Sequence, residues 1–485
     1  MISTNANALA VQVDPVPTRP PAQGPTGDVE FSYNPQDGVV LEPGTTVIRG
    51  VRPGPSVEKA RLGSGAPAPR NGNYVYSPQE RGFHGANALA AVARTIEIFE
   101  KALGEPIKWA FRGQQITIHP DGGQMINAYY SRQDGSLNFF HDTDPVTGRT
   151  FYSGDSGEVV AHETGHAILD GLRPGYLSTW SPDPGAFHES FGDVLAMLAC
   201  LQDDRVVARV VEQTGGDLSR PNIAANLGEE LGVAINHASG ENVTGGDYTR
   251  TAINKFVWQD PSTLPERGGP DQLGSEVHDF SRLWTGAMYD VIKGITDDNM
   301  QKGMGAAEAL KAASTEGLQL YAGLMRTAPR GDHTYRDMAV ALLQADRQFH
   351  DGKRSGLIQK VFTDRRILPQ GLDIPDARDT RAFVPEEEAV RKVQVSLDGP
   401  RFGRFSGALV ETGVDSGQAL FSDAESSQRV QQNLERLIAQ GRILYTDPGK
   451  PVSQQDLIDP QGRPYIGVVR WEDGQMQIER VKILS

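Results

Sequence analysis

The chain has 485 residues, with 47 Lys or Arg against 62 Asp or Glu, which gives a formal net charge of −15 at pH 7. This acidic balance repels nucleic acids and anionic lipid surfaces, so neither is expected as a partner. The single cysteine excludes an intrachain disulfide and a thiolate metal cluster, and no run of about 18 apolar residues marks a membrane-spanning helix.

The first 80 residues are expected to form an extended or weakly ordered lead-in. Eleven of the 31 prolines lie before Arg70, interleaved with Gly, Ser and Thr. The first residues have neither the basic start nor the apolar stretch of a signal peptide. We therefore expect a protein that is cytoplasmic or exported by a leaderless route, and the sequence does not decide between the two.

After the lead-in, the spacing of apolar residues predicts helices and strands. A spacing of three and four residues indicates helices, which we place at residues 86–103, 158–172, 186–201, 280–293, 305–326 and 334–349. Short β-type runs separated by Asp-Gly turn signals predict an antiparallel sheet with hairpins, at residues 115–119, 125–130 and 137–141. These elements predict an amino-terminal α/β lobe at residues 81–174 and a mainly helical lobe at residues 175–370.

A separate domain is predicted at the carboxyl end. A stretch rich in Pro, Arg and Asp from Pro369 to Glu388 indicates the boundary. β-branched residues then alternate with polar ones in KVQVSL, GALVET and YIGVVRW, around one predicted helix near residues 428–439. Residues 386–485 are therefore expected to form a small α+β tail domain, and the fold class of the chain is α+β.

The motif with the most specific chemistry is H-E-x-x-H, from His162 to His166 on a predicted helix. Residues four apart lie on one helix face, so both imidazoles can bind the same Zn²⁺, and Glu163 can reach a water bound to that ion. Val159 and Leu169 share this face, so both histidines are expected to be buried. Two core histidines bonded to backbone carbonyls are the alternative interpretation.

The next predicted helix carries two carboxylates, Glu189 and Asp193, on an otherwise apolar face. A buried carboxylate without a partner costs several kcal/mol, so each needs a cation or a donor. We predict that Glu189 is the third zinc ligand and that Asp193 accepts a hydrogen bond from an imidazole ligand, His162 in the simplest assignment. Two histidines, one glutamate and a water form a catalytic zinc site. Cys200 is expected to be a small buried hydrophobic residue.

Four motifs resemble, in the same order, those of thermolysin and the related gluzincin metallopeptidases. They are Asn127-Ala128-Tyr129-Tyr130, Val159-Val160-Ala161 before the H-E-x-x-H motif, Gly185–Glu189 followed by Asp193, and Val277–Ser281. The resemblance covers about residues 80–365 and leaves out the lead-in and the tail domain. It implies a two-lobed fold with a zinc cleft between the lobes and zinc-dependent hydrolysis of peptide bonds.

The resemblance also implies roles for residues outside the zinc helix. His278 would donate a hydrogen bond to the oxyanion of the reaction. Asn127 and the Ala128 backbone would hold the substrate as an added edge strand. Arg250 would bond a substrate carbonyl, with a solvated surface arginine as the alternative. Tyr176 is the nearest candidate for the family's tyrosine that polarises the scissile carbonyl, although the loop that carries it is longer here.

The chain departs from the family pattern at two further places. His188 stands where the family usually has asparagine, and it is either a partner of a zinc ligand or an outward-facing residue. Relatives often bind structural calcium, so Ca²⁺ is a second candidate ion. Glu158 occupies the position before the zinc helix where a calcium ligand would lie, and Asp203-Asp204 is the acidic pair that follows.

The sequence therefore predicts a zinc endopeptidase in which Glu163 acts as the general base toward a metal-activated water. A non-catalytic, zinc-containing protein that binds peptides through the edge near Asn127 is the alternative. The expected partners are peptide or protein substrates, with an apolar residue favoured after the scissile bond by the resemblance. The tail domain is a candidate module for recognising a substrate or another partner.

Overall fold

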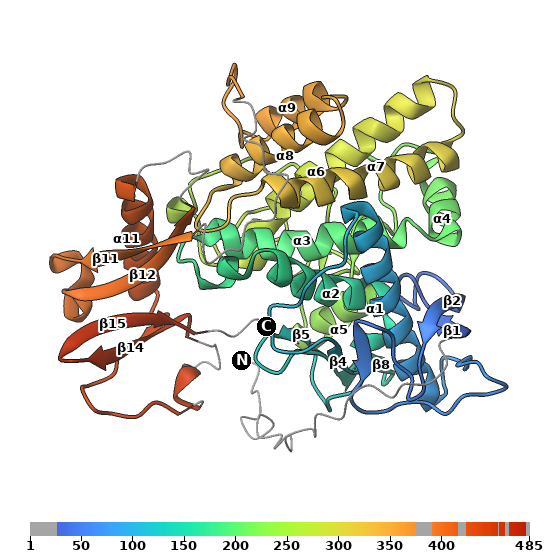
Figure 1. The fold of residues 1–485 in the computed structure, drawn as a ribbon, viewed down its shortest axis with the longest axis horizontal. Coiled ribbons are helices and arrows are strands. Elements are labelled where there is room, and N and C mark those ends of the chain that lie inside the picture. The colour runs from blue at the N-terminus through green and yellow to red at the C-terminus, as the bar shows by residue number, and fades with distance from the viewer. Residues whose placement is uncertain (1–26, 375–389, 416–422, 454, 461–464, 482–485) are drawn as a thin grey trace.

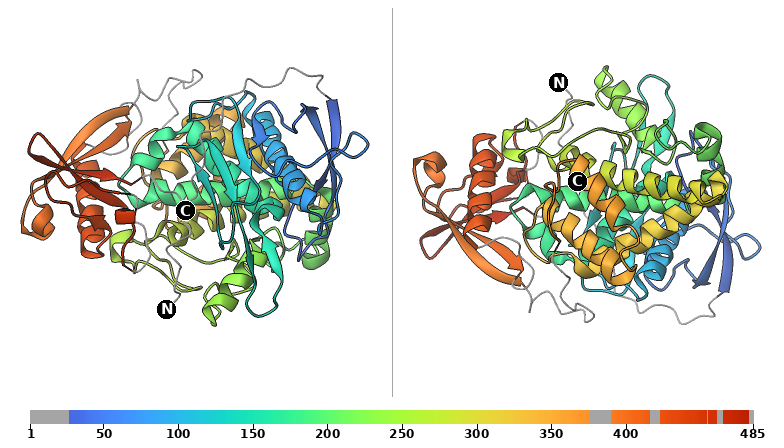
Figure 2. Two further views of the ribbon diagram at one scale, coloured as in Figure 1. Left: turned by 90° about the horizontal axis from the view of Figure 1, so that it is seen from below. Right: turned by 90° about the horizontal axis from the view of Figure 1, so that it is seen from above.

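The computed structural model of the chain describes residues 27–374, 390–415, 423–453, 455–460 and 465–481. It shows a mixed α+β fold, as the sequence predicts, with a helical centre and small sheets around it (Figure 1). The carboxyl-terminal domain lies at one end of the molecule and the first two strands lie at the other, and both views in Figure 2 show the same arrangement.

The helical centre contains the predicted helices; three of them are longer than predicted by three or more residues, and the others agree within one residue at each end. They are α1 (Arg81–Leu103), α2 (Gly157–Leu172), α3 (Pro182–Cys200), α6 (Val277–Gln301), α7 (Ala306–Thr327) and α8 (Tyr335–Phe349). Local chemistry sets several ends: Ser156 caps α2, a capping box of Thr334 and Asp337 starts α8, and Gly104 ends α1 at a φ of 77°. Shorter helices complete the set: α4 (Asp204–Thr214), α5 (Glu229–Ser239) and α9 (Ser355–Asp364).

A four-stranded sheet lies beside α2, in the order β3-β4-β6-β5. Its strands are β3 (Ala60–Leu62), β4 (Ile116–His119), β5 (Ala128–Ser131) and β6 (Ser136–Phe139). The predicted antiparallel sheet is wrong in part, because β4 runs parallel to both β3 and β6. The turn at Asp134-Gly135 does make the antiparallel β5–β6 hairpin, but the chain between β4 and β5 is long enough to place β6 next to β4. Strand β5 is therefore an edge strand.

The expectation of a weakly ordered lead-in is wrong for residues 27–80. Strands β1 (Gly27–Tyr33) and β2 (Gly44–Val51) form an antiparallel pair. Phe31 is fully buried and stacks on Tyr74, with ring centroids 4.7 Å apart. The proline- and glycine-rich composition hides these short strands, because the few apolar residues between the turns are enough to anchor them. Residues 1–26 lie outside the described residues.

Two large hydrophobic cores, besides one small cluster near Ala196, organise the described residues. One runs from Phe31 to Ile374 and joins residues of the predicted amino-terminal and helical lobes. The tail domain has its own core between α11 (Asp423–Ala439) and a sheet. The strands of this sheet, in the order β11-β12-β15-β14-β13, are β11 (Val390–Leu397), β12 (Ala408–Asp415), β15 (Gln475–Arg480), β14 (Gly467–Glu472) and β13 (Ile443–Leu444). Trp180, from the segment between α2 and α3, is buried in the tail core.

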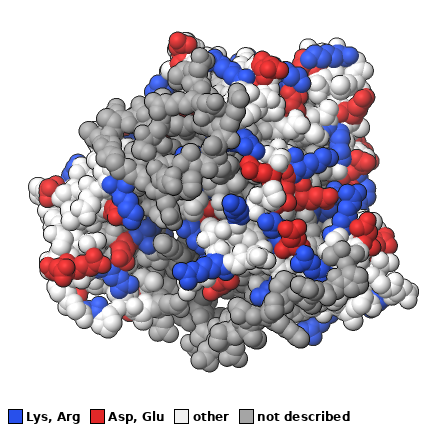
Figure 3. Space-filling model, viewed as in Figure 1, with Lys and Arg blue, Asp and Glu red and all other residues white. Residues whose placement is uncertain are grey.

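The remaining strands are short pairs near α2 and α5. They are β7 (His141–Thr143) with β8 (Thr150–Tyr152), and β9 (Asn226–Leu227) with β10 (Arg250–Thr251). On the face shown in Figure 3, acidic and basic side chains are interspersed. Within the described residues, none of the helices combines the length and the apolar composition needed to cross a membrane.

Candidate metal centre

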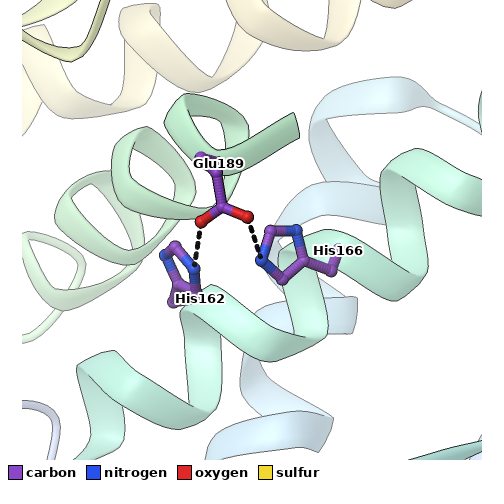
Figure 4. Close-up of side chains that lie close together, drawn as sticks. All are labelled: His162, His166 and Glu189. Atoms are coloured by element: carbon purple, nitrogen blue, oxygen red, sulfur yellow. Dashed lines mark ion pairs between the residues drawn. The ribbon is translucent and has the colours of Figure 1, made fainter. Parts of the chain in front are cut away.

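Helices α2 and α3 bring the three predicted zinc ligands together (Figure 4). His162 Nε2 lies 3.6 Å from Glu189 Oε2, and His166 Nε2 lies 3.7 Å from Glu189 Oε1. These separations are too long for hydrogen bonds. Two ligands at about 2.0 to 2.2 Å from one tetrahedral Zn²⁺ are about 3.4 Å apart, so the three side chains fit a shared ion. All three are buried, and their ligand atoms lie within 4.8 Å of one another.

Two glycines allow the helices to approach this closely. A Cβ on Gly192 of α3 would lie 2.7 Å from His162 Nδ1, and a Cβ on Gly165 of α2 would lie 3.0 Å from Gly192 Cα. A larger residue at Gly192 would therefore move the imidazole of His162. The H-E-x-x-H motif and the glutamate helix meet because both contribute a glycine at their crossing.

Asp193 anchors His162 from the side opposite Glu189. Asp193 Oδ1 lies 2.9 Å from His162 Nδ1, close enough for an ion pair but outside hydrogen-bond geometry, so the predicted hydrogen bond stays a prediction. Arg250 donates to both oxygens of the same carboxylate at 2.7 and 3.2 Å. The Thr285 hydroxyl donates a further hydrogen bond at 3.3 Å. Burial opposes ionisation, but Arg250 and His162 outweigh it and hold the pKa of Asp193 well below its usual range. The carboxylate is therefore ionised and can orient His162.

His188 is the corresponding partner of His166. Its ring is fully buried, and the Nδ1 atoms of the two imidazoles lie 2.8 Å apart. Burial lowers the pKa of His166 to about 3 and that of His188 well below its usual value, so both rings are neutral. If His166 binds a metal through Nε2, its proton must lie on Nδ1. That N–H then donates a hydrogen bond to His188 Nδ1. His188 thus faces the site, which settles the two alternatives that the sequence left open.

The charges at the centre suit a cation. Burial would raise the pKa of Glu189, but the protonated imidazoles of His278 and His162 lower it well below its usual range. Burial opposes protonation of His162, yet Asp193 and Glu189 outweigh it and raise the pKa of His162 to about 10. Glu189 Oε2 is buried and receives no hydrogen bond of normal geometry from the described residues. A divalent cation would satisfy this oxygen and replace the proton on His162.

A pocket opens beside the three ligands and contains most of the other predicted site residues. Glu163 lines it, and burial raises the pKa of Glu163 to about 7. His278, at the start of α6, lies with Nε2 3.2 Å from Glu189 Oε2 and Nδ1 2.7 Å from Glu276 Oε1. Its side chain is 36% exposed, so it faces the open side of the pocket. Sequence reasoning missed Glu276, whose place two residues before His278 as the helix cap was the available signal.

The predicted substrate-binding residues also line the pocket. Asn127 and Ala128 lie at the start of edge strand β5, and Asn127 Oδ1 accepts a hydrogen bond from the Ala128 amide at 2.8 Å. Arg250 lines the same space while it holds Asp193. The pocket also has apolar walls, which the sequence did not predict individually, made by Val159, Leu227 and Leu231.

The predicted catalytic role of Tyr176 is wrong. The chain after α2 turns into a short 3₁₀ helix, Pro174–Ser178, which directs Tyr176 into the core. Its side chain is fully buried, its hydroxyl donates to the Pro329 carbonyl, and its ring lies 4.4 Å from that of His333. Tyr176 does not line the pocket. The path of a proline- and glycine-rich loop is not set by periodicity, so nearness in sequence misled the assignment.

A second group of buried acids could hold a metal ion: Asp37, Glu158 and Glu229. Burial and mutual repulsion raise the pKa of Glu158, and burial raises that of Glu229 to about 7. Both oxygens of Glu229 are buried without a hydrogen-bond partner among the described residues. Sequence reasoning named Glu158 and missed the other two, which come from distant segments.

The Asp203-Asp204 pair does not fit the calcium site that the sequence suggested. Asp203 Oδ2 lies 2.9 Å from Arg205 Nη2 and caps helix α4. Asp204 Oδ1 lies 2.9 Å from Lys311 Nζ, and its side chain is 94% exposed. Both carboxylates thus have cationic partners of their own.

Comparisons with known protein families and with curated proteins find no match to this chain. Its function therefore has to be argued from the site. The described residues contain three side chains that could hold a metal ion, and they place the Glu163 carboxyl group and the His278 imidazole in the adjoining pocket.

Proposed function

We propose that the protein is a zinc-dependent endopeptidase of the thermolysin-like kind. The observation that carries the proposal is the convergence of His162, His166 and Glu189 on one point beside a pocket that also contains Glu163 and His278. The alternative of two core histidines bonded to carbonyls does not account for a glutamate between their Nε2 atoms. We also propose the two-lobed arrangement of that family, with the cleft between the β5 side and the α6 side of the pocket.

Bound by these three side chains, Zn²⁺ would polarise the scissile carbonyl and lower the pKa of a water toward 7. Glu163 accepts the proton of the attacking water and passes it to the leaving amine, and a pKa near 7 suits both transfers. His278 Nε2 donates a hydrogen bond to the developing oxyanion. Glu276 holds the other nitrogen of that ring at 2.7 Å, which fixes its orientation.

The pocket also supports a way of holding the substrate. The backbone of an extended peptide pairs with edge strand β5 from Ala128 onward, which is recognition by strand addition. An apolar side chain next to the scissile bond packs against Val159, Leu227 and Leu231. Arg250, fixed by Asp193, lies where it can bond a substrate carbonyl.

The alternative is a protein that binds zinc and a peptide but does not cut it. The two functions differ in what Glu163 does, because this residue is not among the metal ligands. We therefore expect Glu163→Gln to keep zinc at the wild-type stoichiometry and to lower kcat by about 10² to 10⁴-fold. The measurement is cleavage of casein and of a short peptide with an apolar residue after the scissile bond, with and without a chelator.

Three results together would support the proposal. Wild type cleaves in a chelator-sensitive way, Glu163→Gln does not cleave although elemental analysis finds its zinc, and Glu189→Ala loses the metal. An exposed glutamate on α4, replaced in Glu212→Gln, serves as the matched control. Full activity of Glu163→Gln would remove the mechanism, and peptide binding without cleavage by wild type would favour the alternative.

A further inference from the structure

A buried tryptophan docks the tail domain on residues 27–374, which we call the catalytic part of the chain. Trp180 lies in the tail core, and its indole Nε1 donates to the Glu411 carbonyl at 3.2 Å. The Asn433 side chain on α11 donates to the Trp180 carbonyl, and Arg480 on β15 donates to the Thr179 carbonyl. Two adjacent residues at the end of the segment before α3 are thus held by the tail domain.

The same face of α11 contacts a second segment of the catalytic part. Arg436 donates to the Ser275 hydroxyl, while its other nitrogens donate to Asn433 Oδ1 at 2.6 and 3.3 Å. Arg442, just beyond α11, has Nε 3.7 Å from Glu266 Oε1. Because Asn433 also bonds Trp180, Arg436 belongs to one continuous network between the two parts.

Ser275 and Glu266 belong to the loop that leads into α6. The loop is closed by two backbone bonds, from the Ser275 amide to the Pro265 carbonyl at 2.8 Å and from the Glu276 amide to the Glu266 carbonyl at 2.9 Å. Ser275 is 2% exposed, so its hydroxyl is not a surface group. A tail arginine therefore contacts the residue immediately before the helix cap.

Glu276 connects this loop to the candidate catalytic histidine. Its carboxylate accepts hydrogen bonds from the His278 amide at 3.0 Å and lies 2.7 Å from His278 Nδ1. His278 Nε2 then points to Glu189, 3.2 Å away. The contacts run without a gap from Arg436 through Ser275 and Glu276 to the ring that faces the metal centre.

We propose that the tail domain positions His278, with Arg436 as the positioning residue that holds the loop from residue 265 to residue 276. This rests on the proposed function, because it assigns His278 the role of oxyanion donor. A hydrogen-bond donor held at the wrong distance loses most of its effect on the transition state, whereas substrate binding along β5 is unaffected.

The test compares Arg436→Ala, Ser275→Ala and their double variant with wild type in the full chain. We expect each single variant to lower kcat for a short peptide by about tenfold, with KM within about twofold and zinc content unchanged. Both substitutions remove the Arg436–Ser275 contact, so the double variant should lose less than the sum of the two single losses. Any extra loss in Ser275→Ala belongs to the bond from its hydroxyl to the Pro265 carbonyl, 3.1 Å long. Ser275→Ala tests the contact from the catalytic side if Arg436→Ala disturbs α11. Arg470→Ala, on β14 of the tail, is the matched control.

Hydrogen–deuterium exchange gives a readout that does not need activity. Residues 265–280 should exchange faster in Arg436→Ala and in Ser275→Ala, but not in Arg470→Ala. Unchanged kcat together with unchanged exchange would overturn the positioning role, and so would additive losses in the double variant. If wild type proves inactive, the proposed function fails, and the exchange experiment alone decides whether the tail holds the loop.

Discussion

At the scale of single residues, the imidazole pair of His166 and His188 is the least ordinary feature of the centre. Zinc-bound histidines usually donate their second N–H to a carboxylate or a carbonyl. Here the acceptor is a neutral ring, which can accept at Nδ1 only in the tautomer that carries its proton on Nε2. His188 Nε2 is buried and has no hydrogen-bond partner among the described residues, so this tautomer leaves its N–H donor unsatisfied there.

This pairing predicts that His188 supports metal affinity. Replacing it in His188→Ala removes the acceptor, and we expect zinc affinity to fall by about 10 to 100-fold. His188→Asn keeps a carbonyl acceptor and should recover most of the loss. Competition with a chromophoric chelator measures the affinity, with His119→Ala on β4 as the control. Equal affinity in wild type and His188→Ala would show that His166 needs no such partner.

The predicted site residues that the structure brings together most closely are those whose geometry a helix fixes. His162 and His166 are four apart on α2, and Glu189 and Asp193 are four apart on α3, so each pair shares a helix face before any tertiary contact is known. Tyr176 has no such constraint, and its loop turned into the core. Residue-level prediction succeeded where local periodicity determines direction.

At the scale of elements, the crossing of α2 and α3 determines the metal centre. The two helices are closest near Gly165 and Gly192, which leaves no room for a side chain between them. This contact sets the distance from the histidine pair to Glu189. The geometry of the candidate metal centre therefore depends on the helix pair and on the two glycines at its crossing.

The crossing predicts an effect of a single methyl group. In Gly192→Ala the new Cβ would lie 2.7 Å from His162 Nδ1, so the ring must move away from Asp193. We expect at least about a tenfold loss of zinc affinity, similar to the loss of an outer-shell partner. Gly356→Ala on α9, where a Cβ meets no atom within 4 Å, should leave affinity unchanged. The same chelator competition measures the affinity. Wild-type zinc affinity in Gly192→Ala would show that the helix crossing has room for the added methyl group.

The order of strands was harder to predict than the helices. Asp134-Gly135 correctly indicated the β5–β6 hairpin, because a tight turn is a local property. The parallel pairing of β4 with β6 depends on packing against the helices, which leaves no local signal. For β1 and β2, the proline-rich composition predicted an extended segment, although a few apolar residues anchor the two strands.

At the scale of the whole molecule, two contacts join segments that the sequence treated as separate. Trp180 fixes the tail domain, so a recognition role for that domain would have to operate from this docked position. The acids Asp37, Glu158 and Glu229 join the segment after β1 to helices α2 and α5. We propose that Ca²⁺ binds this acid cluster, because backbone amides donate to Asp37 and Glu158 but both oxygens of Glu229 are buried without a hydrogen-bond partner among the described residues.

The acid cluster makes the stability of the whole chain depend on pH. Glu229 has a pKa of about 7 in the fold against 4.5 in its absence, because burial disfavours its charge. Below about pH 4.5, Glu229 is protonated in both the folded and the unfolded chain, so it costs no folding stability. The loss of stability grows as pH rises and is complete above about pH 7. Without calcium, Tm should therefore fall from pH 5 to pH 7.5 more steeply in wild type than in Glu229→Gln, which keeps the shape and lacks the charge.

Calcium should reverse this loss, since it binds the ionised cluster and leaves the unfolded chain alone. At about 100 times its Kd, a ligand of the folded state adds about 2.7 kcal/mol, which is several degrees in Tm. We expect this gain in wild type at pH 7.5, a smaller gain at pH 5, where protons compete, and little gain in Glu229→Gln. Asp204→Asn, at an exposed acid paired with Lys311, should behave as wild type. An equal gain in wild type and Glu229→Gln would place any calcium elsewhere, and no gain at either pH would leave the cluster as carboxyl groups held by shared protons.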